Sequence, residues 1–336
     1  MKKIRIAQIG MNRHSHAGSV FHSLTKYPDI FEIAGYALVE DEREISERKL
    51  KAFDGYRELT LEEILNDPTI EAVTVETDEI HLTKYATLAA LHGKHIHMEK
   101  PGSPSLADFE KLIETVKTGG KVFHIGYMYR YNPYVIDLIK KVKSGELGEI
   151  TSVEAQMNCW HDVSLRNWLS DFPGGMMFFL GCHLVDLVYQ IQGRPERIIP
   201  LNKNTGIDGS VGTDFGMAIF EYKNGVSFAK TSACEVGGYL RRQLVVSGSK
   251  GTIELKPFEV PVPKTNFDIY TDRVECTPGY DWHHPGEASR CEPFDRYDGM
   301  ILAFAKMVRA EITNPYTCDY ELDLFKILLE CCGEEI

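Results

Sequence analysis

The chain has 336 residues, which is too long for one compact core and predicts two domains. Hydrophobic residues make up 43% and charged residues 26%, which indicates a soluble globular protein. The net charge of -12 argues against general binding to nucleic acid or anionic membranes. No apolar run reaches the length of a membrane span and no secretory signal is evident, so we expect a cytoplasmic protein. The eight cysteines lack zinc-ligand spacing and are expected to be reduced thiols.

Strands and helices alternate through the first third of the sequence. A capping box begins one helix, because Thr60 and Glu63 can each satisfy the other's backbone amide. Apolar runs predict strands at 4–9, 31–39, 70–75, 95–98 and 121–126, with helices at 16–26, from 60, at 81–92 and at 104–118.

This alternation predicts a parallel sheet with helices on both faces. Ligands of such sheets bind at the carboxyl ends of the strands, near the point where strand order reverses. Three segments fall there, at 10–16, 76–81 and 99–102, and they are the first places to look for chemistry.

Four motifs then identify a resemblance to the Gfo/Idh/MocA oxidoreductase family. They are Glu99-Lys-Pro, the segment 126–133 (GYMYRYNP), the run 174–186 containing Gly-Gly and His183, and the strands and turns of 214–256. The resemblance extends over nearly the whole chain. It implies a Rossmann domain at 1–126 and an α+β domain at 127–336 built on a large, mainly antiparallel open sheet. The last helix is a candidate to pack back on the first domain. The resemblance also implies NAD or NADP as cofactor and a polyol-, sugar- or similarly hydroxylated substrate.

Lys100 is the first candidate for catalysis. Transfer of hydride from a secondary alcohol needs a group that takes the hydroxyl proton, and a partly buried lysine suits this role. The family resemblance implies a cis peptide at Pro101. Without the other motifs, Lys100 would read as an ordinary surface lysine before a proline.

His183 is the second catalytic candidate, and Asp186 lies on the same face of its predicted helix as a candidate substrate contact. The alternative is a structural histidine in an apolar helix. Many family dehydrogenases have an aspartate four residues before the histidine, where this chain has Phe179. Three interpretations of this departure are open: another group takes the role of the aspartate, the redox step differs, or activity is lost.

The loop after the first strand departs from the dinucleotide-binding pattern G-x-G-x-x-G. It reads Gly10-Met-Asn12-Arg13-His14-Ser15, so only the first glycine remains. Asn12 tolerates unusual backbone angles, a phosphate can sit on the following helix N-terminus, and Arg13 or His14 can add charge. We expect Gly10, Asn12, Arg13, His14 and Ser15 to bind the cofactor. The alternative is that this loop no longer binds a dinucleotide.

The remaining cofactor candidates follow the second, third and fourth strands. Leu38 stands where NAD-preferring relatives have an acidic residue, so Glu40 is expected to replace that anchor, and Arg43 is the nearest basic group. The other candidates are Glu76, Thr77, His81, Glu99 and Lys100.

Candidate substrate contacts, besides Asp186, are Tyr127, Arg130 and Trp168. The aromatic and polar cluster around Tyr127 and Arg130 can bind a sugar or join the domains. Trp168 can close the pocket or be a core aromatic. His95 and His97 share a strand face but lack a third ligand, so no metal site is expected.

Alternating strands with turns near 224–225 and 248–251 predict the second domain's sheet. The domain's own helices are expected to cover one face of this sheet, and in this family the other face often meets a second subunit, so we expect a homodimer or homotetramer. No nucleic-acid or membrane partner is expected.

Three functions remain open. The first is an NAD(P)-dependent dehydrogenase or reductase acting on CH–OH groups, with Lys100 and His183 handling protons. The second is an NAD-dependent lyase or hydrolase that oxidises its substrate transiently. The third is a catalytically silent ligand-binding protein.

Overall fold

The computed structural model describes residues 2–14, 16–279, 283 and 285–336, which form two compact units. The first unit comprises Met1–Tyr127 and Tyr297–Phe325, and the second comprises Met128–Arg296 and Lys326–Ile336. The first break falls one residue after the predicted boundary, and the segment 297–325 groups with the first unit. Within the described residues, no helix has both the length and the apolar character needed to cross a bilayer.

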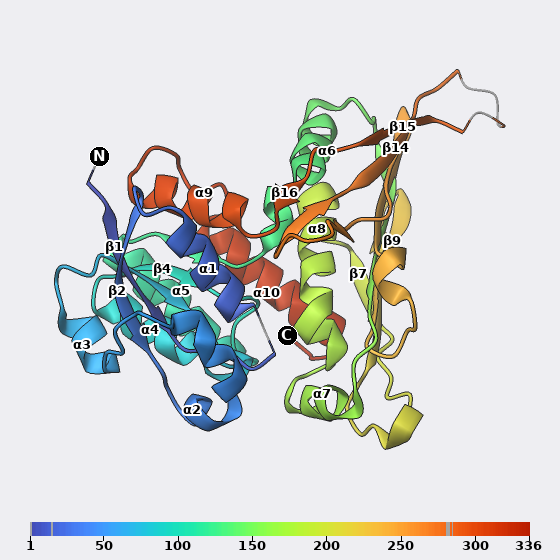
Figure 1. Cartoon of the computed structure of the whole chain (residues 1–336). Helices are drawn as coiled ribbons and strands as arrows, with labels where there is room; N and C mark the ends of the chain where they lie inside the picture. The colour runs from blue at the N-terminus through green and yellow to red at the C-terminus, as the bar shows by residue number, and fades with distance from the viewer. Residues whose placement is uncertain (1, 15, 280–282, 284) are drawn as a thin grey trace. The chain divides into compact units, whose positions relative to one another are not determined.

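A five-stranded parallel sheet forms the centre of the first unit, with strand order β2-β1-β3-β4-β5 (Figure 1). Its strands are β1 (Ile4–Ile9), β2 (Phe31–Ala37), β3 (Ala72–Val75), β4 (His95–Met98) and β5 (Phe123–Ile125). Its helices are α1 (Ala17–Lys26), α2 (Glu42–Ile45), α3 (Leu61–Asn66), α4 (Leu82–Leu91), α5 (Leu106–Gly119), α9 (Asp298–Val308) and the first part of α10 (Cys318–Cys332). The predicted Rossmann-type α/β sheet is confirmed, and the capping box of Thr60 and Glu63 is present at α3.

The strand order reverses beside β1. The chain passes from β1 to β2 on one side and then crosses to β3 on the other side. Ligands of open α/β sheets bind at the carboxyl ends of the two strands that flank such a reversal. Here those ends are Ile9 and Val75, which are register partners, and they are followed directly by Gly10 and Glu76.

A row of buried polar residues crosses this sheet. Gln8, Thr74, His97 and His124 are successive register partners on β1, β3, β4 and β5, and all are fully buried. Thr74 donates a hydrogen bond to Gln8 (3.3 Å), and the Nδ1 atoms of His97 and His124 lie 2.8 Å apart. Strands buried on both faces are usually apolar throughout. These four polar side chains therefore need hydrogen-bond partners inside the protein.

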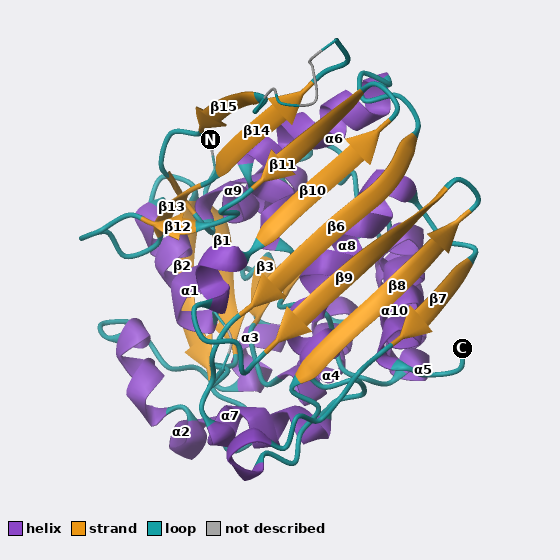
Figure 2. Ribbon diagram, turned by 90° about the vertical axis from the view of Figure 1, so that its right-hand side faces the viewer, coloured by secondary structure: helices purple, strands orange, loops and turns teal. Residues whose placement is uncertain are grey.

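The second unit is built on an eight-stranded, mainly antiparallel sheet of order β15-β14-β11-β10-β6-β9-β8-β7, in which only β6 and β9 pair in parallel (Figure 2). Its strands are β6 (Ile150–Asn158), β7 (Arg197–Pro200), β8 (Phe215–Tyr222), β9 (Gly225–Ser232), β10 (Gln243–Gly248), β11 (Gly251–Leu255), β14 (Asp272–Cys276) and β15 (Glu287–Arg290). A small sheet is formed by β12 (Val260–Pro261), β13 (Asp268–Tyr270) and β16 (Phe294–Asp295). The predicted large open sheet is confirmed.

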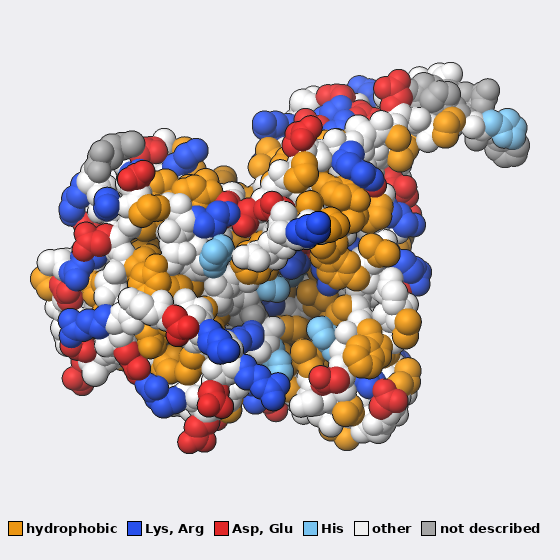
Figure 3. Space-filling model, viewed as in Figure 1, with side chains coloured by type: hydrophobic (Ala, Val, Ile, Leu, Met, Phe, Trp, Pro, Cys, Tyr) orange, Lys and Arg blue, Asp and Glu red, His pale blue; other side chains and the backbone are white. Residues whose placement is uncertain are grey.

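Helices α6 (Pro133–Ser144) and α8 (Cys182–Gln192) lie behind this sheet in Figure 2, and α7 (Val163–Trp168) lies at its lower end. Residues Met177–Gly181 form a π-helical turn before α8. The predicted helix at 174–191 is therefore a regular α-helix only in its second half. On the visible surface, acidic and basic side chains are interspersed (Figure 3).

Candidate functional site

The loops after β1 and β3 are pressed together at the switch point. Gly10 has a φ of 91°, and a Cβ atom on it would lie 2.6 Å from the backbone N and Cα of Thr77. Only glycine fits there without strain. The amide of Asn12 donates to the carbonyl oxygen of Glu76 (2.8 Å), which ties the two loops together.

Asn12 is the centre of the loop after β1. Its buried side chain donates through Nδ2 to Thr77 O (3.1 Å) and to Glu79 Oε2 (2.6 Å), and its Oδ1 accepts from the amide of His14 (2.6 Å). Its φ is not positive, so backbone tolerance does not explain the asparagine. The side chain instead joins the loop after β1 to Thr77 and Glu79 of the loop after β3.

The N-terminus of α1 suits an anion. The ten-residue helix has no acidic side chain in its first turn, and exposed amides at such an end attract negative charge. Arg13 lies beside Asp78, with Nε 3.6 Å from Oδ2. Ser15, also predicted to bind cofactor, lies outside the described residues. The Gly10 cradle and this helix end together fit the pyrophosphate of a dinucleotide.

An ionised carboxylate follows β2. Glu40 accepts hydrogen bonds from Lys84 Nζ (2.6 Å) and Tyr85 Oη (2.7 Å), which hold the pKa of Glu40 below its usual value. His81 Nδ1 lies 3.8 Å from the same carboxylate, so the structure brings these two predicted cofactor residues together. Arg43 pairs with Glu58.

Three buried glutamates gather at the carboxyl ends of β3 and β4. Glu76 and Glu79 are fully buried and Glu99 is 3% exposed. Burial, with Glu99 and Glu79 nearby, raises the pKa of Glu76 well above 4.5, which favours its protonated form.

Lys100 lies against these carboxyl groups. It is 2% exposed, its Nζ is 3.9 Å from Glu99 Oε1, and its amide donates to the same oxygen (3.1 Å). The Lys100–Pro101 bond is cis, as the resemblance implies. Reciprocal hydrogen bonds between Thr83 and Ser103 (3.0 and 2.8 Å) attach the following turn to α4. The neutral amine form of such a lysine can take a proton from a bound substrate, and the adjacent carboxylate stabilises the ammonium that results.

Two features of this region escaped the sequence analysis. Lys49, in the 3-10 helix Glu47–Phe53, donates to Asn12 O (3.0 Å), although nothing in its sequence neighbourhood marks it. The second is the contact of His97 with His124 and, at 3.6 Å from Nε2, with Glu76 Oε1. Burial lowers the pKa of His97 to about 3, so its ring is neutral. Two histidines at equivalent positions of adjacent predicted strands were the available signal.

In the second unit, the predicted residues Arg130 and Asp186 form a buried ion pair. Arg130 Nε and Nη2 donate to the Asp186 carboxylate at 3.0 and 2.8 Å, and Gln190 adds a further bond of 2.8 Å. His183, one turn before Asp186, packs edge-on against Tyr129 with ring centroids 4.9 Å apart. The pair and the ring fix the helix that carries His183.

Tyr129 also belongs to a cluster that the sequence analysis missed. Glu259, fully buried, accepts from Tyr129 Oη (2.7 Å) and Arg242 Nη1 (2.6 Å) and pairs with Arg296 Nε (2.7 Å). Burial alone would raise the pKa of Glu259, but the two arginines outweigh it and the pKa falls below 4.5. No signal in the sequence joins residues so far apart.

Phe179, the departure from the family pattern, packs in an aromatic cluster. Its ring meets the predicted Trp168 edge-on at 5.1 Å, and Trp168 meets Phe172 at 4.7 Å. An aromatic contact thus stands where relatives carry a carboxylate. The other predicted aromatic, Tyr127, is buried at the end of the first unit's N-terminal segment.

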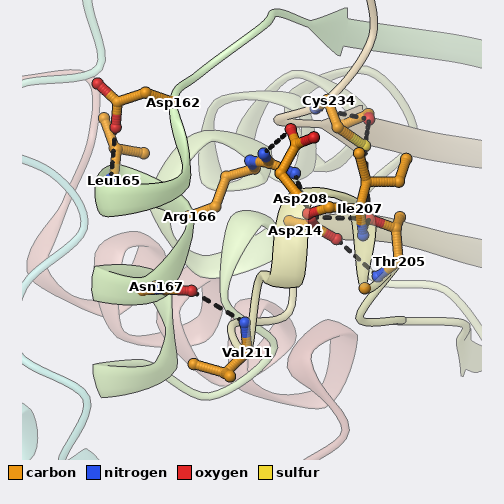
Figure 4. A network of polar contacts seen from close by, with 12 residues as sticks. Asp162, Leu165, Arg166, Asn167, Thr205, Ile207, Asp208, Val211, Asp214 and Cys234 are labelled. Carbon is orange, nitrogen blue, oxygen red and sulfur yellow. Dashed lines mark hydrogen bonds and ion pairs between the residues drawn. The ribbon is translucent and has the colours of Figure 1, made fainter.

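The helix that carries Trp168 is fixed by a polar network (Figure 4). Arg166, fully buried, donates to Asp208 (2.6 Å) and Ile207 O (3.0 Å), and its Nη1 lies 3.4 Å from Asp214. Thr205 donates twice to Asp214, through its amide and its hydroxyl (both 2.9 Å). The loop 204–214 is thereby held against α7.

The switch point, the Gly10 cradle and the N-terminus of α1 are typical of a dinucleotide-binding domain, and comparison with known proteins agrees. Residues 4–127 match the oxidoreductase-family model described as an NAD-binding Rossmann fold, and residues 135–254 match the GFO/IDH/MocA C-terminal domain. The chain belongs to the Gfo/Idh/MocA family of oxidoreductases.

Named relatives include three oxidoreductases. The chain is 31% identical to YhhX of Escherichia coli (strain K12) over 41% of its length and 40% of YhhX. It is 26% identical to trans-1,2-dihydrobenzene-1,2-diol dehydrogenase of Bos taurus (61% and 59%) and 24% identical to the NADP(+)-dependent scyllo-inositol 2-dehydrogenase IolW of Bacillus subtilis (59% and 55%). The matches thus span less than two thirds of each of these relatives.

Solved structures share the fold over almost the full chain. An oxidoreductase of Thermotoga maritima superposes with a TM-score of 0.78 at 20% identity, covering 98% of this chain and 96% of that one. KijD10, a 3-ketoreductase of Actinomadura kijaniata solved with NADP, gives 0.76 at 16% (97% and 96%). Aldose-aldose oxidoreductase of Caulobacter crescentus gives 0.74 at 17% (99% and 98%).

Proposed function

We propose that this oxidoreductase transfers hydride between a nicotinamide dinucleotide and a secondary alcohol or ketone of a polyol- or sugar-like substrate. The observation that carries the proposal is the buried Lys100 beside Glu99, at the strand ends next to the switch point. The dihydrodiol, inositol and aldose activities in the names of the relatives and structural neighbours support a hydroxylated substrate.

The residues divide the work between binding and proton handling. Gly10, the loop amides and the α1 N-terminus hold the pyrophosphate, with Glu40 and His81 available to the ribose. The bound nicotinamide supplies or accepts the hydride. In the oxidative direction, Lys100 Nζ takes the hydroxyl proton while Glu99 stabilises the resulting ammonium.

His183 is the second group proposed to contact substrate. Its ring is fixed by Tyr129 and by the helix that the Arg130–Asp186 pair holds. Phe179 stands four residues before His183, where many family dehydrogenases have an aspartate. We therefore assign the orientation of the substrate hydroxyl to His183 and the proton transfer to Lys100. Trp168 and Tyr127 remain proposed contacts with the substrate.

The test is hydride transfer from NADH and NADPH to a panel of keto-sugars and inosose-type ketones, and the reverse reaction with the alcohols. Lys100→Met should lower kcat about 100- to 10,000-fold, because it removes the proton-transfer group. Nicotinamide fluorescence would show that Lys100→Met still binds cofactor. Lys111→Met, an exposed lysine on α5, is the matched control and should keep full activity.

Three outcomes would change the proposal. Undiminished turnover by Lys100→Met would remove Lys100 from the mechanism. Substrate consumption without net change in NAD(P)H would identify the alternative, a lyase or hydrolase that oxidises its substrate transiently. Cofactor binding without any turnover on the panel would favour the silent ligand-binding protein.

We further propose that the chain is a cytoplasmic homodimer or homotetramer that associates through the open face of its large sheet. Met217, Ile219 and Phe228 are half-buried on that face, and Ile219 and Phe228 are cross-strand partners. Helices α6 and α8 cover the other face of the sheet, so a second subunit would cover this one. Light scattering should find an oligomer, and Phe228→Glu should shift it toward monomer; a wild-type monomer would contradict the proposal.

A further inference from the structure

Glu79 is the buried carboxyl group most directly connected to the dinucleotide loop. It lies in the 3-10 helix Glu79–His81 after β3 and is fully buried. Its Oε2 accepts from Asn12 Nδ2 at 2.6 Å, and Asn12 Oδ1 in turn holds the amide of His14. Within the described part of the chain, no donor reaches Oε1 of Glu79. One half of this carboxyl group therefore supports the loop, and the other half has no hydrogen-bond donor.

The charged groups around Glu79 come from three segments of the chain. Glu76 follows β3, Asp78 precedes Glu79, and Glu99 and Lys100 follow β4. Lys49, from the 3-10 helix after α2, is the second cation, and burial lowers the pKa of Lys49 while Glu79 and Glu99 oppose this. Acidic groups outnumber cations in this cluster, so ionising every carboxyl group would leave excess negative charge away from water.

Protonation removes that excess. Burial, assisted by Asp78 and Glu99 and opposed by Lys100 and Asn12, raises the pKa of Glu79 from 4.5 to about 8. At neutral pH the carboxyl group is then mostly protonated and uncharged. Above this range it becomes a buried anion directly beneath the loop that carries Asn12.

We propose that binding of a nicotinamide dinucleotide to the first unit is coupled to uptake of one proton by Glu79. This inference rests on the proposed function. The pyrophosphate brings negative charge to the loop that Glu79 supports, and like charges in a partly buried site repel. The ionised form of Glu79 must therefore take a proton from solvent when the dinucleotide binds. Glu79 acts through Asn12 and through its charge, so it is a positioning residue for the cofactor.

The coupling predicts pH-dependent affinity that is independent of catalysis. NADH binding, followed by nicotinamide fluorescence, should weaken about tenfold between about pH 7 and about pH 9, within the usual range of couplings between sites. Calorimetry of NADH binding at about pH 8, in buffers that differ in ionisation enthalpy, should show net proton uptake.

Two substitutions distinguish the effect of the charge of Glu79 from the effect of its hydrogen bond to Asn12. Glu79→Gln keeps the size and the acceptor for Asn12 but cannot ionise, so it should bind NADH with the neutral-pH affinity of wild type and lose the tenfold dependence. Glu79→Ala removes the acceptor and should bind more weakly at every pH. Glu63→Gln is the control: Glu63 is exposed in the capping box of α3 and its pKa is lowered rather than raised, so its pH profile should equal that of wild type.

A second readout uses the unliganded protein. The side-chain NH2 signals of Asn12 in 15N NMR should titrate with a midpoint near the pKa of Glu79, about 8, and should not titrate in Glu79→Gln. A flat wild-type pH profile, or the same tenfold fall in Glu79→Gln, would overturn the coupling while leaving the proposed function intact. Failure of folded wild type to bind NADH and NADPH at about pH 7 would instead overturn the proposed function, and the coupling with it.

Discussion

Buried glutamates behave in opposite ways in the two units. Glu79 of the first unit and Glu259 of the second are equally inaccessible to water. Glu79 has its pKa raised to about 8, whereas the pKa of Glu259 lies below its usual value. Burial acts in the same direction on both, so burial alone cannot explain the difference.

The difference lies in the partners. Two arginines and a tyrosine hydroxyl direct their donors at Glu259, while Glu79 shares its cations with other carboxyl groups. A buried acid with dedicated donors stays ionised, and one without them keeps its proton. The second unit thus uses buried charge to fix its structure, and the first unit keeps titratable protons beside the loop that we propose binds the cofactor.

The largest expected effect comes from removing the ionised partner. Glu259→Gln should destabilise the second unit by about 3–5 kcal/mol, because it leaves Arg242 and Arg296 buried without a counter-charge. Denaturant unfolding followed by tryptophan fluorescence measures this, since Trp160 and Trp168 lie in that unit. Acid should have a related effect, because the stability from Glu259 is present above pH 4.5 and lost as pH falls through its lowered pKa. A loss below about 1 kcal/mol would show that the arginines do not depend on Glu259.

The stability contributed by Glu79 should depend on pH in the opposite direction to that contributed by Glu259. Because the folded-state pKa of Glu79 is raised, its contribution to stability is full below 4.5 and is lost as pH rises toward about 8. Over that window the group lowers the unfolding free energy by about 1.4 kcal/mol per pH unit. Glu79→Gln should make the pH dependence of unfolding shallower by that amount, as measured by circular dichroism in denaturant. An unchanged slope would mean that Glu79 is ionised in the folded state.

The smallest effect belongs to an exposed carboxyl group. Glu63 accepts from the Thr60 amide in the capping box, and this bond lowers the pKa of Glu63. Thr60→Ala removes the reciprocal bond and should cost about 1 kcal/mol of stability. Thermal unfolding would detect this, with Thr60→Ser as a control that keeps the cap. A loss of stability as large as that of Glu259→Gln would show that burial does not explain the difference between buried and exposed carboxyl groups.

The sequence was sufficient where local patterns decide structure. The bounds of β1 and β4 match their apolar runs, and Thr60 with Glu63 marks the start of α3. Gly10 directly follows the predicted strand 4–9, and β1 ends at Ile9. The Glu99-Lys-Pro motif located Lys100 at the end of β4, because it directly follows a short strand.

The remainder depends on contacts between distant segments. Asn12 looked like a backbone-tolerant residue, but Glu79 and Thr77, more than sixty residues away, give it a hydrogen-bonding role. Likewise, nothing beside Glu259 in the sequence indicates Arg242 or Tyr129 as its partners. Residue types predict which groups can ionise, whereas the folded neighbours determine which of them do.

The most direct test of the account is calorimetric titration of the stripped protein with NADH and NADPH at about pH 7. The account predicts that each chain binds one dinucleotide, and that Asn12→Ala weakens this binding at least about tenfold by releasing the loop. Binding by wild type with this loss would place the cofactor on the Gly10–His14 loop. Failure of the folded protein to bind either dinucleotide would contradict the account.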